Sequence, residues 1–163
     1  MKNLISKSDS IFVAGHNGLA GSAICRALKK FGYKNILTVS RKELNLRDQI
    51  KVKNWFKENS PDIVILAAAK VGGILANSIY PYDFIIENIQ IQTNVIESAF
   101  QNSVKRLLFL SSSCAYPKEC SQPIKEEYLL SNYLEKTNEN YALAKIVGMK
   151  FCEALRKQKN FDA

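Results

Sequence analysis

Hydrophobic residues along the chain fall into two alternating patterns. Short, mainly apolar runs occur at 11–14, 35–39, 63–67 and 106–110. Such runs are typical of strands in a parallel sheet that is covered on both faces. Apolar residues recur at helical spacing over 22–31, 48–59, 82–101 and 140–157. This alternation predicts right-handed crossovers and an α/β fold, a Rossmann-like doubly wound parallel sheet flanked by helices.

Three polar residues lie within the long helix predicted at 82–101: Asn88, Gln92 and Asn94. Exposure to solvent is the simplest expectation for each of them. The alternative for Asn88 is a buried side chain that bonds the loop after the fourth strand. The region 118–138 is polar and irregular. We expect a loop there on the substrate side, with one helical turn.

The first strand runs directly into a turn with the spacing Gly15-x-x-Gly18-x-x-Gly21. Gly15 can bend the chain, Gly18 lets a pyrophosphate approach the main chain, and Gly21 lets the next helix pack closely on the strand. Free N–H groups at the helix start would face the phosphates. A tight turn without a ligand is the alternative, because glycines mark many strand-to-helix turns. The position at the first strand-helix junction favours a dinucleotide site.

The second predicted strand ends at Ser40 and Arg41, which bear on the choice of cofactor. An acidic residue here would bind the ribose hydroxyls of NAD, whereas an arginine suits the 2′-phosphate of NADP. Arg41, assisted by Ser40, therefore indicates NADP(H), although Lys42 and Glu43 lie beside it. A solvated loop arginine is the alternative.

Of the seven tyrosines, Tyr141 alone has a lysine four residues later, Lys145. On a helix this spacing puts both side chains on one face. We expect the ammonium group to lower the pKa of the phenol, so that Tyr141 gives a proton to a carbonyl oxygen while Lys145 also bonds the nicotinamide ribose. Ser112, in the hydroxyl cluster after the fourth strand, would orient the same oxygen. A pair on the helix surface is the alternative.

Length and composition narrow the function classes. The 163 residues suit one domain, and no run approaches the ~20 apolar residues that span a bilayer. Because the polar start gives no signal peptide, we expect a cytoplasmic protein without membrane contact and with free thiols. The four cysteines lack C-x-x-C spacing and the single histidine, His16, lies in the glycine loop, so we expect no metal site. The charge of +8 is spread over several helices, so we expect no nucleic-acid partner.

Five segments in chain order carry a more specific signal. They are 13–24 (VAGHNGLAGSAI), 41–46 (RKELNL), 66–73 (LAAAKVGG), 110–118 (LSSSCAYPK) and 137–145 (TNENYALAK). Together they resemble the extended short-chain dehydrogenase/reductase family, and within it the epimerase-reductases that act on GDP-sugars. The third and fourth segments are much more specific than the generic family motifs.

The resemblance implies site residues for NADPH and for the reaction. It places the pyrophosphate at the first loop, Arg41 near the 2′-phosphate and a serine segment beside the nicotinamide. The cofactor residues in the loop are Gly15, His16, Asn17, Gly18, Leu19, Ala20 and Gly21, and those after the fourth strand are Leu110, Ser111, Ser112 and Ser113. Asn17 departs from the arginine common in this loop.

The implied reaction converts GDP-4-dehydro-6-deoxy-D-mannose to GDP-L-fucose by epimerisation and 4-keto reduction. Ser112, Tyr141 and Lys145 would serve the reduction, and Cys114 would act as a base in the preceding 3,5-epimerisation. Another nucleotide-sugar epimerase or dehydratase is an alternative activity.

Four predicted strands are fewer than the six that a doubly wound dinucleotide fold commonly has. The family continues with another strand, a histidine that acts with the cysteine, and a smaller domain that holds the GDP-sugar. We therefore expect residues 1–163 to form an incomplete NADP-binding domain whose GDP-sugar site needs a separately encoded carboxyl-terminal half. An unpaired edge beyond the fourth strand would invite association, for example as a homodimer. The alternative to an enzyme half is a non-catalytic NADP(H)-binding module or a decayed fragment.

Overall fold

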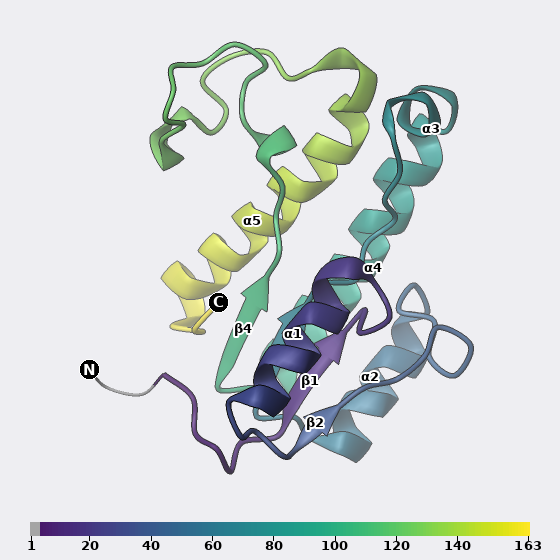
Figure 1. The fold of residues 1–163 in the computed structure, drawn as a ribbon, viewed down its shortest axis with the longest axis vertical. Coiled ribbons are helices and arrows are strands. Elements are labelled where there is room, and N and C mark those ends of the chain that lie inside the picture. Colours follow the sequence, from purple (N-terminus) through teal and green to yellow (C-terminus); the bar gives the residue numbers. More distant parts are fainter. Residues whose placement is uncertain (1–3) are drawn as a thin grey trace.

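The four apolar runs form one parallel sheet in the computed structural model, which describes residues 4–163 (Figure 1). In the order β2-β1-β3-β4, the strands are β1 (Ile11–Ala14), β2 (Ile36–Leu37), β3 (Ile63–Leu66) and β4 (Arg106–Phe109). The helices are α1 (Leu19–Lys30), α2 (Gln49–Asn59), α3 (Ile74–Ile79), α4 (Pro81–Gln101) and α5 (Glu139–Lys159). Three 3₁₀ turns are η1 (Ser113–Ala115), η2 (Glu126–Tyr128) and η3 (Lys136–Asn138). The predicted Rossmann-like α/β class is confirmed.

The strand order sets where a ligand can bind. All the pairs are parallel, so the carboxyl ends of the strands lie at one edge of the sheet. From β1 the chain moves outward to β2 and then crosses to β3 on the other side of β1. In open α/β sheets such a reversal opens a crevice at the carboxyl ends, where ligands bind. The expected place in this chain lies between the ends of β1 and β3.

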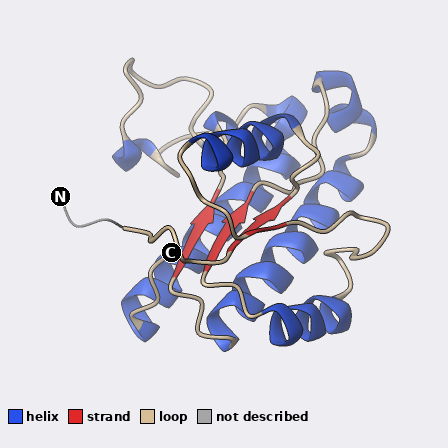
Figure 2. Ribbon diagram, turned by 60° about the horizontal axis from the view of Figure 1, so that its bottom comes forward, coloured by secondary structure: helices blue, strands red, loops and turns tan. Residues whose placement is uncertain are grey.

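The two faces of the sheet are covered unequally (Figure 2). Helices α2, α4 and α5 contribute to the core on one face, which includes Val64 and Leu107. On the other face the core is smaller, and its members include Val13 of β1 and Leu28 of α1. Within residues 4–163, β4 pairs with β3 alone, and Leu108 on its α1 side is 51% exposed. The predicted unpaired edge beyond the fourth strand is confirmed.

Some boundaries differ from the predicted ones. β2 covers Ile36–Leu37 rather than 35–39. α1 begins at Leu19 rather than at 22, because the extended Gly18 directly precedes the first helical residue. α3 was not predicted, since its large apolar residues Ile74, Leu75 and Ile79 are exposed and give no one-sided pattern.

The expectation that Asn88, Gln92 and Asn94 face solvent is wrong. All three are buried, with exposed fractions of 3%, 2% and 8%. Each bonds main chain of a neighbouring segment, as buried amides must to offset lost hydration. Gln92 Nε2 donates to Ala144 O (2.7 Å), and Asn94 Nδ2 donates to Leu46 O (2.9 Å).

Asn88 bonds a different loop from the one expected. Its Oδ1 accepts from the Lys70 N–H (2.9 Å), and its Nδ2 donates to the Lys70 carbonyl (3.0 Å). Nδ2 also donates to Phe84 O within α4 (2.7 Å). The amide therefore fixes the loop after β3, at the edge of the sheet where a ligand is expected, and not the loop after the fourth strand.

Within 4–163, no helix has the length and apolar character needed to cross a bilayer. The described part of the chain holds no group of three or more His, Cys, Asp or Glu side chains arranged to bind a metal ion. All four cysteines are free thiols. Cytoplasmic localisation stays a prediction.

Candidate functional site

The glycine turn after β1 has the steric requirements that its sequence predicts. Gly15 adopts φ +89°, a left-handed conformation, and a Cβ on it would lie 2.6 Å from Ala68 N. A Cβ on Gly21 would lie 2.2 Å from Gly15 O, so α1 packs closer to the turn than any side chain allows. Gly18 is different, because its nearest neighbour would be 3.4 Å away, again Gly15 O. Space beside Gly18 is therefore left for a ligand.

The amino end of α1 is suited to bind an anion. Gly18 is the N-cap residue, no side chain caps the helix, and no acidic residue lies in its first turn. The first N–H groups of an α-helix have no partner within the helix, and they lie at the positive end of its dipole. A pyrophosphate is the kind of group that such an end binds.

A pocket of about 490 Å³ lies at this end of the sheet, where the carboxyl ends of β1 and β3 meet α1. It is largely apolar, with Leu44, Leu46 and Ile91 in its wall beside the alanines that follow β3. Such a wall fits an adenine ring and the glycine turn fits a pyrophosphate, so the chain's own residues match the adenosine half of a dinucleotide. Of the predicted cofactor residues, those lining this pocket are Gly15, His16, Asn17, Gly18, Leu19, Ala20 and Arg41.

Arg41 and its neighbour Ser40 differ in how far other residues already occupy their polar groups. The Arg41 side chain is 74% exposed, and its NH2 lies 3.5 Å from Glu87 Oε2 on α4. Ser40 is engaged by Glu43: its N–H and its Oγ both donate to Glu43 Oε2, at 3.0 and 2.7 Å. These two bonds from Ser40 hold the pKa of Glu43 below its usual value. Arg41 is therefore available to a phosphate, whereas Ser40 must first leave Glu43.

The predicted proton-transfer residues meet at the carboxyl end of β4. Lys145 is 4% exposed, and its Nζ donates to Leu110 O at 2.8 Å. Burial lowers the pKa of Lys145 to about 8. Tyr141 is half-buried, and the Ser112 hydroxyl lies near enough to its phenol to act on the phenol's pKa. The three side chains that the sequence grouped are thus brought together.

The pKa of Tyr141 departs from expectation. Burial raises the pKa of its phenol, and the hydrogen bond from Ser112 only partly opposes this. The prediction that Lys145 lowers this pKa is wrong for this arrangement, because the Lys145 amine is directed to the carbonyl of Leu110 and lies 5.8 Å from the centre of the Tyr141 ring.

Cys114 lies in η1, next to the same cluster. Its N–H donates to Ser112 Oγ at 3.3 Å, and Asn138 Nδ2 lies 3.2 Å from its sulfur. Ser111 Oγ donates to the sulfur of Met149 at 2.9 Å, and Ser113 is exposed. The contact with Asn138 fixes the position of the Cys114 sulfur beside Ser112.

The two groups of residues occupy neighbouring parts of one sheet edge. The pocket wall does not include Leu110–Ser113, Tyr141 or Lys145, nor does it include Gly21. Leu110 N–H donates to Leu66 O at 3.1 Å, which joins the start of the serine segment to the end of β3. The alanines that follow β3 line the pocket. The carboxyl end of β3 therefore connects the two groups.

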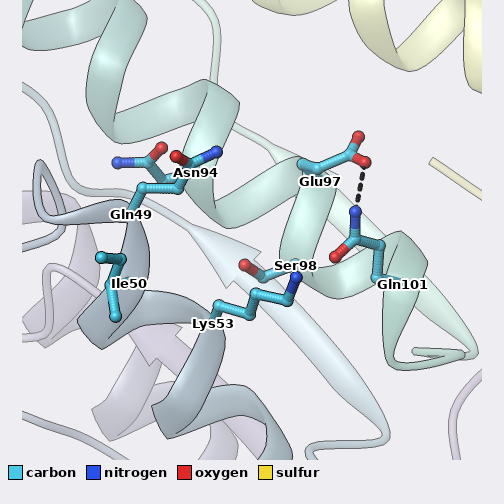
Figure 3. Close-up of a pocket in the computed structure, with 7 residues that line it drawn as sticks. All are labelled: Gln49, Ile50, Lys53, Asn94, Glu97, Ser98 and Gln101. Carbon is cyan, nitrogen blue, oxygen red and sulfur yellow. Dashed lines mark hydrogen bonds between the residues drawn. The ribbon is translucent and has the colours of Figure 1, made fainter.

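A second pocket lies away from this edge, between α2 and α4 (Figure 3). It encloses about 220 Å³, and most of its wall is polar: Gln49, Ile50, Lys53, Asn94, Glu97, Ser98 and Gln101. Gln101 Nε2 donates to Glu97 Oε1 at 2.6 Å, one turn away on α4. The second pocket contains none of the predicted site residues and lacks glycine main chain, so the pocket at the sheet edge is the better candidate.

Three charged residues of the main pocket were not predicted as site residues from the sequence: Arg47, Lys70 and Glu87. Asn138, the neighbour of the Cys114 sulfur, was not predicted either. The one available signal was position: Lys70 lies in the matched segment 66–73 and Asn138 in 137–145. Glu87 and Arg47 lie outside every matched segment.

Known proteins resemble the chain over nearly its whole length. It is 55% identical to GDP-L-fucose synthase 1 of Arabidopsis thaliana over 163 residues, 100% of this chain and 50% of that protein. It is 51% identical to GDP-L-fucose synthase of Escherichia coli (strain K12) over 152 residues, 93% of this chain and 47% of that protein. A solved structure, MlghC, the GDP-mannoheptose C4 reductase from Campylobacter jejuni with NADP bound, is similar with a TM-score of 0.93 at 39% identity, covering 96% of this chain and 50% of that one.

The chain thus spans about half the length of the curated relatives that it matches. The model of the NAD dependent epimerase/dehydratase family matches residues 11–163, which include β1, the glycine turn and the whole of α5. The chain belongs to the NAD dependent epimerase/dehydratase family.

Proposed function

We propose that this chain binds NADPH and carries the proton-transfer residues of an enzyme that epimerises and reduces GDP-4-dehydro-6-deoxy-D-mannose to GDP-L-fucose. The observation that carries the proposal is the meeting of Ser112, Tyr141 and Lys145 at the edge of the sheet that also holds the glycine turn. The relatives named as GDP-L-fucose synthases and the NADP-bound C4 reductase support the substrate class and the cofactor. The proposal assigns the remaining GDP-sugar contacts to residues outside these 163.

In the reduction, NADPH when bound supplies the hydride that the 4-keto carbon accepts. Tyr141 donates its phenolic proton to the keto oxygen, and Ser112 orients that oxygen by a hydrogen bond. Lys145, with a pKa of about 8, is charged at neutral pH, and it stabilises the phenolate once its amine turns from Leu110 O toward Tyr141. Before that turn, its bond to Leu110 O holds the amine between the helix and the end of β4.

In the epimerisation, Cys114 removes a proton from a carbon next to the keto group. Such a proton is acidic enough to be removed because the neighbouring carbonyl accepts the charge. The amide of Asn138, 3.2 Å from the sulfur, holds the side chain that acts as the base in position. The acid that returns the proton on the opposite face is assigned to the part of the enzyme outside this chain.

Two measurements test the proposal. Calorimetric titration of the chain with NADPH should show binding, and its absence would overturn the cofactor site. Turnover is then followed as loss of NADPH fluorescence with GDP-4-dehydro-6-deoxy-D-mannose, after mixing the chain with the product of the adjacent downstream reading frame. Tyr141→Phe should bind NADPH as the unaltered chain does and lose reduction. Undiminished reduction by this variant would contradict the acid role.

The same experiments distinguish the alternatives. NADPH binding without turnover under any mixture favours a non-catalytic NADP(H)-binding module, and lack of both favours a decayed fragment. Faster turnover of a different GDP- or UDP-4-keto sugar than of GDP-4-dehydro-6-deoxy-D-mannose would assign another epimerase or dehydratase activity. Dimer formation by the chain is measured separately by sedimentation.

A further inference from the structure

A buried carboxylate in the wall of the main pocket faces three cations. Glu87 of α4 has a side chain that is 10% exposed. Its Oε2 lies 3.5 Å from Arg41 NH2 and 3.4 Å from Arg47 NH1, and its Oε1 lies 3.2 Å from Lys70 Nζ. Within residues 4–163, the wall of this pocket contains no other Asp, Glu, Lys or Arg side chain than Glu87 and these three cations. One negative charge therefore faces three positive charges, and the wall keeps an excess of positive charge.

The two arginines are held to different degrees. Arg47 makes two contacts with α4, since its NH1 reaches Glu87 and its Nε donates to Gln90 Oε1 at 3.0 Å. Its side chain is 36% exposed. Arg41 makes one contact, with Glu87, and is 74% exposed. Arg47 is thus fixed in the wall, whereas Arg41 can move toward a ligand.

Movement of Arg41 toward a ligand would not leave the Glu87 carboxylate without a cation partner. An unpaired buried charge is strongly unfavourable, which would normally keep Arg41 on Glu87. Here Arg47 and Lys70 remain on Glu87 when Arg41 leaves. Both guanidinium groups lie within 3.5 Å of the same oxygen, Glu87 Oε2, so a phosphate bound beside this oxygen can meet both of them.

We propose that Arg47 is a second specificity-determining residue for the 2′-phosphate of NADPH, fixed by Glu87 and Gln90 beside the exposed Arg41. The inference rests on the proposed function and deepens it. A phosphomonoester carries between one and two negative charges at neutral pH, whereas NADH presents neutral hydroxyls at the same position. The excess positive charge of the wall therefore distinguishes the two cofactors. Position 17 of the glycine loop, an asparagine, adds no charge to this recognition.

The test is a comparison of NADPH and NADH binding by Arg47→Gln. Equilibrium titration of nicotinamide fluorescence should show that the Kd for NADPH rises about tenfold, the effect of losing one charge-assisted contact. The Kd for NADH should change less than about twofold, because NADH offers no charge to Arg47. Added salt should weaken NADPH binding less steeply in the variant than in the unaltered chain. Lys53→Gln, which removes a charge from the other pocket, is the matched control and should change neither Kd.

Each outcome decides a separate point. Equal weakening of both cofactors, or no change in either, would overturn the assignment and leave Arg47 a structural residue. Arg47→Lys keeps the charge without the Nε bond to Gln90, and it should retain part of the NADPH preference even if Arg47→Gln fails to fold. Loss of the whole preference in Arg47→Lys with NADH binding intact would refute recognition by charge. Failure of the unaltered chain to bind NADPH would overturn the proposed function and this inference with it.

Discussion

The close packing of α1 against the glycine turn makes a sharp prediction about two glycines. Replacement of Gly21 by alanine puts a Cβ 2.2 Å from Gly15 O, 2.7 Å from Gly15 C and 3.0 Å from His16 Cα. All three neighbours are main chain, so no side chain can turn away to relieve the overlap. Replacement of Gly18 puts the Cβ 3.4 Å from its nearest neighbour, and the φ of Gly18, −77°, is open to alanine. The second variant is therefore the matched control for the first.

The expected loss of stability in Gly21→Ala combines two opposing effects. Overpacking against a structure that cannot yield costs about 3 kcal/mol, the upper part of its usual range. Alanine within a helix is about 1 kcal/mol more favourable than glycine. The net loss is about 2 kcal/mol, which lowers the Tm of a chain of this size by about 4–8 °C. In Gly18→Ala the weaker N-cap and the stiffer unfolded chain roughly cancel, and we expect a change below about 1 kcal/mol.

Urea unfolding followed by circular dichroism measures the stability, and titration with NADPH measures the function of the loop. Gly18→Ala should stay folded and bind NADPH more weakly, by about tenfold or more, because its methyl group occupies the space left for the pyrophosphate. Equal stability of Gly21→Ala and the unaltered chain would refute the close approach of α1 to the turn. Unchanged NADPH binding by Gly18→Ala would refute the placement of the pyrophosphate.

Two further predictions concern buried polar groups. Burial lowers the pKa of Lys145 from 10.5 to about 8. Between these two pH values the unfolded chain therefore binds more protons than the native chain. The free energy of unfolding of the unaltered chain, measured against that of Lys145→Met, should rise by about 3 kcal/mol as the pH increases through this range. Urea unfolding at several pH values measures this, and a difference that does not vary with pH would contradict it. Asn88→Ala should lower the free energy of unfolding by about 2–3 kcal/mol, because it leaves the Lys70 N–H and carbonyl unpaired. A loss below about 0.5 kcal/mol, typical of a surface substitution, would show that these bonds contribute little.

The strands and the glycine turn could be predicted from the sequence because their causes are local. Four wholly or mainly apolar runs have one stable arrangement when helices separate them, a covered parallel sheet. The turn follows from steric limits at single residues, as the positive φ of Gly15 and the contact at Gly21 show. α2 begins after Asp48, which caps it by accepting the Lys51 N–H at 3.0 Å. Each of these features depends on residues that are near one another in the sequence.

The polar residues of α4 could not be placed in this way. An asparagine that faces water and one that bonds a buried loop have the same polarity. Whether the side chain is exposed or buried depends on segments that are distant in the sequence. Asn94 bonds Leu46, and Gln92 bonds Ala144 across the α4–α5 contact. Glu87 is a similar case, since its burial depends on three cations from two loops. The missed polar residues of α4 thus connect it to the loops that form the pocket and to α5.

The wrong direction for the pKa of Tyr141 changes the account of the proposed reduction. Helical spacing places Lys145 on the same face as Tyr141, but the amine is directed by the carbonyl of Leu110, 35 residues away in the sequence. With its pKa raised by burial, Tyr141 keeps its proton at neutral pH and is present in the form that donates. The requirement that remains is stabilisation of the phenolate after donation. Lys145 is charged below its pKa of about 8, and it can meet this requirement if its amine leaves the Leu110 carbonyl and turns toward Tyr141.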